Sequence, residues 1–185
     1  MLQIVVPEAV VEEFDEETSE FVYTTVCKEQ TLHLEHSLLS LSKWESKWCK
    51  AFLSKVAKTD EETVDYVKCM TLTQNVNPEV YKHLTEKNIR DIKEYIDAPM
   101  TATTFSKDET SKANHEVVTA ELIYYWMISL NIPLECQKWH LNRLLTLIRV
   151  CNVKNAPPKK RSKRDIMRRN AELNAARRKQ FNTRG

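Results

Sequence analysis

The sequence predicts an α+β protein that is predominantly α-helical: a small N-terminal antiparallel β-hairpin or sheet packs on a helical body, and an extended basic C-terminal helix follows. Three observations support this fold class. Gly185 is the single glycine among 185 residues, so internal turns have to use Asn, Asp or Pro, which disfavours a tightly turned all-β fold. Apolar residues recur at helical spacing over most of the chain. β-branched and aromatic runs precede the first helical pattern.

Charge and composition divide the chain into three segments. Residues 1–36 form a β-rich segment with an acidic loop, residues 37–153 a helical core, and residues 154–185 a basic helical tail. Eight acidic residues against one lysine give the first 30 residues a net charge of −7, and twelve basic residues against two acidic ones give the tail +10. The two ends therefore project electric fields of opposite sign.

The N-terminal segment contains three β-rich runs. Residues 2–6 predict a short strand stopped by Pro7, residues 21–26 a second strand, and residues 31–36 a half-exposed strand with alternating apolar and polar residues. We interpret the acidic stretch 12–20 between them as a loop. A sheet of this size is marginal alone and has to pack on helices.

Helical periodicity begins after Ser37. It puts Trp44 and Trp48 on one helix face, where we expect core packing rather than binding of bases or peptides. Thr59 opens a capping-box pattern, and Thr85 is placed to cap another helix. Pro78 is placed to start a short helical turn between them.

The strongest core signal lies further along the chain. Residues 116–130 and 134–151 predict two long apolar helices, and the short break 131–133 between them predicts an antiparallel helical hairpin at the centre of the domain. Residues 163–180 predict a final helix with a narrow apolar stripe, and such a polar helix is marginal in water until something binds it.

Several classes of protein do not fit the composition. Phosphate-cradling loops need more glycines than this chain has. Because no run of about 18 apolar residues occurs, we expect no membrane span, and the first residues do not resemble a secretory signal. The five scattered cysteines are then expected to be reduced intracellular thiols.

Metal and catalytic sites are also disfavoured. Cys27, His33 and His36 lack a fourth ligand, and the two histidines would point to opposite faces of a strand. Cys136 and His140 are four residues apart, but we expect this histidine to be buried beside a polar neighbour rather than to activate a nucleophile. We therefore expect no catalytic, cofactor-binding or metal-binding residues.

We therefore expect the protein to bind partners, with charged side chains making the contacts. The acidic residues that we select are Glu12, Glu13, Glu16 and Glu17, and the basic ones are Arg164, Arg168, Arg169, Arg177 and Arg178. Docking to another protein is our first interpretation of the tail, a solvated tail the second and nucleic-acid binding the third, since no base-reading motif occurs. The opposite charges of the two ends also allow self-association.

Four segments resemble tail assembly chaperones of long-tailed bacteriophages and their prophages. They are residues 34–48 (LEHSLLSLSKWESKW), 123–127 (IYYWM), 138–144 (KWHLNRL) and 170–178 (NAELNAARR). The resemblance covers most of the chain from about residue 20.

This resemblance implies a non-enzymatic role in virion assembly. Such proteins bind the long tape measure protein, keep it soluble and help to recruit the major tail tube protein around it in the host cytoplasm. A structural component of the tail or neck (the head–tail connector) and a nucleic-acid-binding protein that acts through its basic tail are the alternatives.

Overall fold

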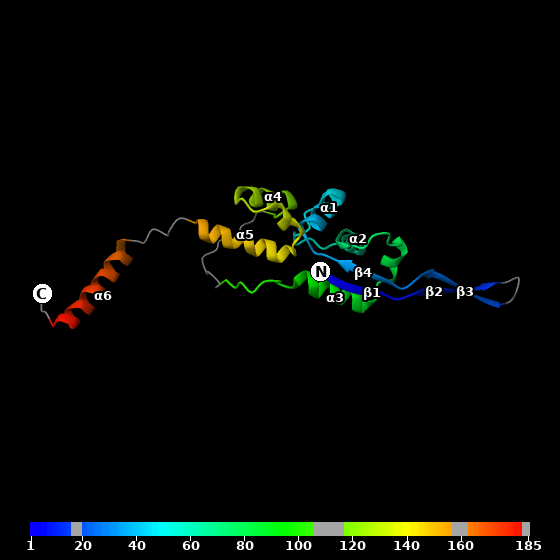
Figure 1. Cartoon of the computed structure of the whole chain (residues 1–185), viewed down its shortest axis with the longest axis horizontal. Helices are drawn as coiled ribbons and strands as arrows, with labels where there is room; N and C mark the ends of the chain where they lie inside the picture. The colour runs from blue at the N-terminus through cyan, green and yellow to red at the C-terminus, as the bar shows by residue number, and fades with distance from the viewer. Residues whose placement is uncertain (16–19, 106–116, 157–162, 183–185) are drawn as a thin grey trace. The chain divides into compact units, whose positions relative to one another are not determined.

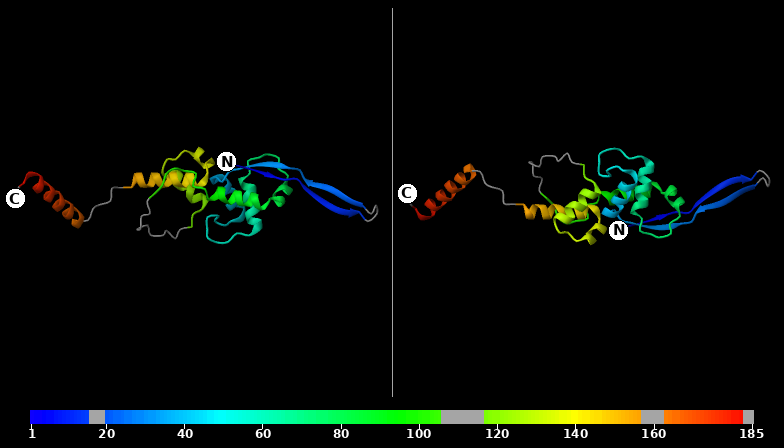
Figure 2. Two further views of the ribbon diagram at one scale, coloured as in Figure 1. Left: turned by 90° about the horizontal axis from the view of Figure 1, so that it is seen from below. Right: turned by 90° about the horizontal axis from the view of Figure 1, so that it is seen from above.

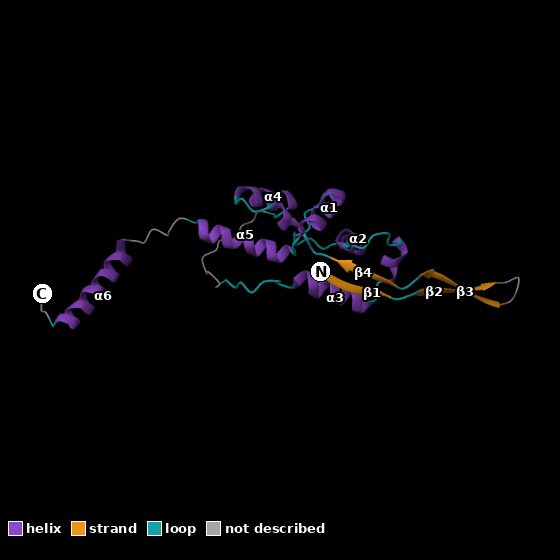
Figure 3. Cartoon of the chain, in the orientation of Figure 1, coloured by secondary structure: helices purple, strands orange, loops and turns teal. Residues whose placement is uncertain are grey.

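The computed structural model describes residues 1–15, 20–105, 117–156 and 163–182. The chain divides into two compact units, Met1–Asn152 and Val153–Gly185. The described residues are mainly helical with small antiparallel sheets at the N-terminus, which confirms the predicted fold class (Figure 1, Figure 3). The strands are β1 (Leu2–Val6), β2 (Ala9–Asp15), β3 (Glu20–Cys27) and β4 (Gln30–Leu34). The helices are α1 (Leu38–Trp48), α2 (Asp60–Met70), η1 (Pro78–His83), α3 (Glu86–Asp97), α4 (Ala120–Ser129), η2 (Leu134–Lys138), α5 (Leu141–Asn155) and α6 (Lys163–Phe181).

The four strands are successive parts of one hairpin. β1 pairs with β4 from Leu2↔Leu34 to Val6↔Gln30, and β2 pairs with β3 in the continuation. Pro7 has no backbone N–H to donate, which suits the interruption between the two parts. Ile4, Val6, Leu32 and Leu34 are buried, whereas most described side chains of β2 and β3 are exposed. The ribbon of β2 and β3 extends beyond the helices that cover β1 and β4 (Figure 2). We call the β2–β3 part the arm.

The predicted acidic loop over residues 12–20 is wrong in its first part. β2 extends to Asp15, so Glu12 and Glu13 lie in a strand opposite Tyr23 and Val22. The glutamates obscured the pattern because an exposed two-stranded ribbon tolerates charged side chains that a buried strand does not. Residues 16–19 lie outside the described part of the chain.

Local capping signals set three helix starts. Thr59 and Glu62 form the predicted capping box of α2, and the Thr85 side chain accepts a hydrogen bond from the Asn88 N–H at the start of α3. Ser37 makes an analogous reciprocal pair with Ser40 at the start of α1. Pro78 lies at the start of the predicted short turn, which is the 3₁₀ helix η1.

Positive backbone φ angles occur without glycine. Asn75, Asn131 and Asn182 adopt φ values of 56°, 52° and 50°, in agreement with the expected use of Asn. Cys49 and Met100 also have positive φ, which composition did not predict. Cys49 ends α1 in the left-handed conformation, and its N–H binds the carbonyl of Glu45, so a helix-terminating hydrogen bond offsets the steric cost.

Two hydrophobic clusters make up the core, and α1 contributes to both. The first joins β1 and β4 to α2, η1 and α3, and it contains Trp44. The second joins α4, η2 and α5, and it contains Leu38 and Leu41 of α1. Trp44 is almost fully buried and its indole N–H donates to the carbonyl of Glu62, which confirms the predicted core role of this tryptophan.

Glu45 connects the elements around α1 through a buried carboxylate. Oε2 accepts a hydrogen bond from the N–H of Ala120 at 2.7 Å, at the start of α4. Oε1 accepts from the N–H of Phe52 at 2.8 Å, in the segment that follows α1. The two oxygens thus satisfy backbone donors that are 68 residues apart (52 and 120) and that have no other partner of their own in a helix or strand.

The predicted continuous helix over residues 134–151 is wrong. Residues Leu134–Lys138 form the 3₁₀ helix η2, and α5 begins only at Leu141. Between them, His140 forms a β-bridge with Ser37, and the Leu141 N–H donates to the carbonyl of His36. This tertiary pairing outweighs the helical periodicity. The predicted short connection of α4 to the second helix is also wrong, because η2 and the bridge at His140 lie between α4 and α5, although both helices contribute to one hydrophobic cluster.

Replacing Glu45 tests whether this carboxylate holds the two clusters together. Glu45→Ala leaves two N–H donors without an acceptor, so we expect it to lower the free energy of unfolding by about 2–4 kcal/mol. Urea denaturation followed by tryptophan fluorescence measures the change. Glu94→Ala, which removes an exposed carboxylate from α3, is the matched control. Equal losses for the two variants would contradict the assigned role.

Candidate interaction surfaces

Helix α6 carries all five of the selected arginines. It is a helix of 19 residues over Lys163–Phe181, and each of its side chains that the structure describes is exposed. Arg168 and Glu172 form an exposed ion pair at 3.9 Å, which contributes little to stability. Because no described side chain of α6 is buried, the helix depends on its own propensity or on a partner.

The arginines of α6 lie on two faces. Ile166, Arg169, Leu173 and Arg177 are spaced by three or four residues, so these two arginines alternate with the two apolar residues along one face. Arg164 and Arg168 are four residues apart and lie on another face. The helix therefore offers one face with mixed apolar and cationic side chains and one that is mainly cationic.

Two of the four selected acidic residues, Glu12 and Glu13, lie in β2 of the arm. The Glu12 side chain is exposed and accepts a hydrogen bond from the Tyr23 hydroxyl at 2.7 Å. This bond to a carboxylate raises the pKa of Tyr23. Glu13 lies next in β2. Glu16 and Glu17 lie outside the described residues, so the four glutamates are not all placed.

The arm also has an exposed apolar face that sequence reasoning missed. Val10, Phe21 and Tyr23 are 50%, 60% and 67% exposed. Phe21 and Tyr23 alternate along β3, and Val10 lies in β2 opposite Thr25, so register puts the three residues on one face of the ribbon. The period-two pattern of residues 21–25 contained this signal. The pairing with β2 was not predicted, because residues 12–20 were interpreted as a loop.

His36 and His140 form a buried cluster with Tyr66 and Tyr95, which we call the histidine cluster. The ring centroids of His36 and His140 are 5.1 Å apart, and Tyr66 and Tyr95 contact them edge to face. Nε2 of His140 donates to the carbonyl of Tyr95 at 2.9 Å, and its Nδ1 accepts from the N–H of Asn142 at 3.3 Å. His140 is therefore held as the neutral imidazole, between α3 and the start of α5.

Burial keeps both imidazoles neutral. It lowers the pKa of His36 from 6.5 to about 4, with a smaller contribution from the neighbouring His140, and it also lowers the pKa of His140. Nδ1 of His36 is 2.6 Å from the Tyr66 hydroxyl, and burial raises the pKa of that phenol. The arrangement closes polar groups inside the core.

The Cys136–His140 pairing considered from spacing is not formed. Both ring nitrogens of His140 bind backbone groups, and Cys136 lies in η2 rather than on the same α-helix. Over the described ranges, no three His, Cys, Asp or Glu side chains are grouped to hold a metal ion.

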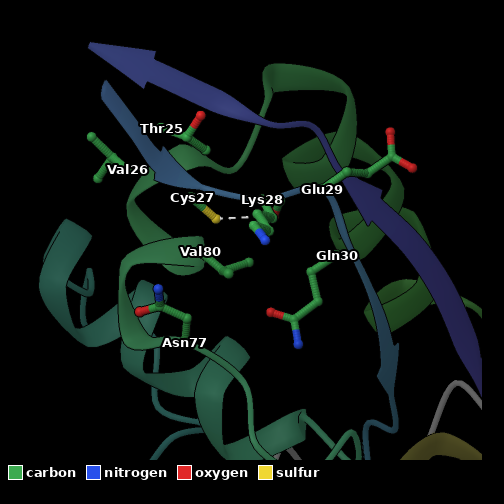
Figure 4. Close-up of a pocket in the computed structure, with 8 residues that line it drawn as sticks. All are labelled: Thr25, Val26, Cys27, Lys28, Glu29, Gln30, Asn77 and Val80. Carbon is green, nitrogen blue, oxygen red and sulfur yellow. Dashed lines mark hydrogen bonds between the residues drawn. The ribbon is translucent and has the colours of Figure 1, made fainter. Parts of the chain in front are cut away.

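A cavity of about 460 Å³ lies where the arm joins the body (Figure 4). The Cys27 thiol donates to the carbonyl of Lys28 at 3.3 Å, and the Val80 side chain lies below it in the figure. Asn77 Oδ1 is already engaged as the cap of η1, accepting from the Glu79 N–H. The carboxylate in the lining, Glu29, points away from the Cys27 thiol in Figure 4, and the thiol donates to a backbone carbonyl instead, so these two side chains do not form an activated nucleophile.

No protein-family model, no curated protein and no solved structure matched the chain in comparisons with known proteins. Among the described residues, no helix is long and apolar enough to cross a membrane.

The depressed pKa of His36 makes the fold sensitive to acid. Below pH 6.5 the unfolded chain binds a proton at His36 that the folded chain excludes down to about pH 4, so stability falls as the pH falls through this window. We expect this group to account for a loss of about 3 kcal/mol across the window. Urea denaturation at a series of pH values measures the slope.

His36→Gln should flatten that slope, whatever its effect on stability at pH 7. His83→Gln removes an imidazole from η1, outside the cluster, and controls for the loss of a histidine side chain. A slope that is unchanged in His36→Gln would show that the buried imidazole is not the source of the acid sensitivity.

Proposed function

We propose that the protein is a non-catalytic assembly factor that binds partner proteins through α6 and the arm, and that it serves as a bacteriophage tail assembly chaperone. Its partners would be the tape measure protein and the major tail tube protein, in the cytoplasm of the host. The exposure of α6 carries the proposal, because a cationic helix that buries almost no described side chain gains its contacts from another molecule.

Two further features support binding as the function. The arm exposes apolar side chains on a two-stranded ribbon whose strands are both sheet edges, and such surfaces are typical of interaction elements. The polar groups of the histidine cluster are engaged within the core. The sequence resemblance supplies the choice of a tail assembly chaperone among assembly factors.

Nucleic-acid binding is the second candidate, since α6 carries exposed arginines and lysines that can release counterions from phosphates. The mixed face of α6, with Ile166 and Leu173 between arginines, favours a protein partner. Aliphatic side chains gain no burial against a phosphate backbone, whereas an apolar groove in a partner protein would bury them.

Charge reversal on α6 tests the proposed function. We expect Arg169→Glu with Arg177→Glu to reduce capture of the co-expressed tape measure and tail tube proteins by at least about tenfold, since it places carboxylates beside the apolar stripe. Pull-down with the purified full chain measures capture. Lys87→Glu with Arg90→Glu, on the exposed surface of α3, controls for the same change in net charge.

Three outcomes would contradict the proposal. Capture that is unaffected by the α6 variant would remove α6 as the binding element. Binding to a random-sequence RNA or DNA that weakens steeply with salt, without capture of either protein, would favour the nucleic-acid alternative. Stoichiometric presence of the protein in purified virions would favour a structural role in the tail or neck.

A further inference from the structure

An apolar slot of about 650 Å³ lies between α2 and α3, and its lining includes no described residue of α6 or the arm. One wall is formed by residues 60, 63, 64 and 67 of α2, and the other by residues 89, 92, 93 and 96 of α3. Each set has the i, i+3, i+4, i+7 spacing of one helix face over two turns. The remaining lining residues come from three places: Tyr66 from α2, Tyr81, Lys82 and Leu84 from η1 and its C-terminal cap, and Phe52 and Lys58 from the segment that follows α1.

The two helices that form the slot make most of their backbone contacts with other elements rather than with each other. α2 packs against α1 and η1, and α3 packs against β1. Val64 and Ile96 are half-buried, and Ile89 remains 40% exposed. The lining therefore keeps apolar surface that these packing contacts do not cover. A groove between two helix faces is the form that receives a third helix, since packed helices interdigitate their side-chain ridges.

Lysines border this apolar surface. Lys58, Lys82 and Lys93 contribute to the lining, against one carboxylate, Asp60. The Lys58 ammonium lies 4.6 Å from the Phe52 ring centroid, and Lys82 is paired with Glu79 at 2.8 Å. Lys93 makes no ion pair with any residue that the structure describes. The rim thus carries positive charge that is only partly balanced.

We infer that the slot binds an amphipathic helix of a partner protein, with acidic side chains beside its apolar stripe. The apolar residues of the partner would pack between α2 and α3, and its carboxylates would meet Lys58 and Lys93. The site is independent of α6, so the inference does not rest on the proposed function. About two turns of the partner helix would lie in the slot, since each wall is two turns long.

Designed peptides test the charge and shape of the slot. The first is a fluorescein-labelled helix of about 14 residues with leucines at i, i+3, i+4 and i+7 and glutamates on both sides of the stripe. A second peptide has lysines in place of the glutamates. Fluorescence anisotropy with the full chain measures both, and we expect the acidic peptide to bind at least about tenfold more tightly.

Two variants place the binding in the slot. Ile89→Asp puts a carboxylate on the α3 wall at a position that is already partly exposed, so the fold should persist, and we expect a loss of at least about tenfold in affinity for the acidic peptide. Lys93→Glu should reduce or reverse the preference between the two peptides. Lys87→Glu, on α3 but outside the slot, should change neither value.

Other occupants would give different results, and each would overturn the inference. Absence of acidic-peptide binding, equal binding of both peptides, or binding that is insensitive to Ile89→Asp and Lys93→Glu would exclude an acidic helix. Self-association that Ile89→Asp abolishes would assign the slot to a second copy of the chain. Dodecanoate binding that Ile89→Asp removes, without peptide binding, would identify a site for a small amphiphile.

Discussion

The two hydrophobic clusters depend on α1, and the Glu45 carboxylate fixes how α1 meets its neighbours. Trp44 packs in the cluster that contains β1 and β4, while Leu38 and Leu41 pack in the cluster of α4 and α5. Glu45 accepts from Phe52 in the segment that follows α1 and from Ala120 at the start of α4. A carboxylate buried this far is tolerated because each of its oxygens accepts a backbone N–H.

Outside this core, many of the charged residues lie on elements whose described side chains are mostly exposed. The arm and α6 are both exposed, and their charges are of opposite sign in the sequence. In the histidine cluster, by contrast, the imidazoles are buried: His140 binds a backbone carbonyl, and burial lowers the pKa of His36 so that it stays neutral. Polar chemistry that is enclosed contributes to stability, whereas polar chemistry on exposed elements is available to other molecules.

Much of the fold could be predicted because its signals are local. The Thr59 and Thr85 caps and the helix of residues 163–180 needed only short windows of sequence. The errors arose where distant segments meet: His140 leaves the helical pattern to pair with Ser37, and β2 is a strand because β3 pairs with it. The arginines of α6 were predictable from charge, but the slot was not, since spacing on α2 and α3 does not reveal that the two faces confront each other.

The separation of Glu45 from Ala120 also orders events during synthesis. All members of the cluster that contains Trp44 lie between Ile4 and Tyr95, so this half can collapse while the C-terminal part is still being translated. The α4 donor of Glu45 lies 75 residues further along the chain, so before α4 is synthesised the carboxylate has only its Phe52 donor. In the nascent chain, Leu38 and Leu41 of α1 therefore lack their packing partners until α4 and α5 have left the ribosome.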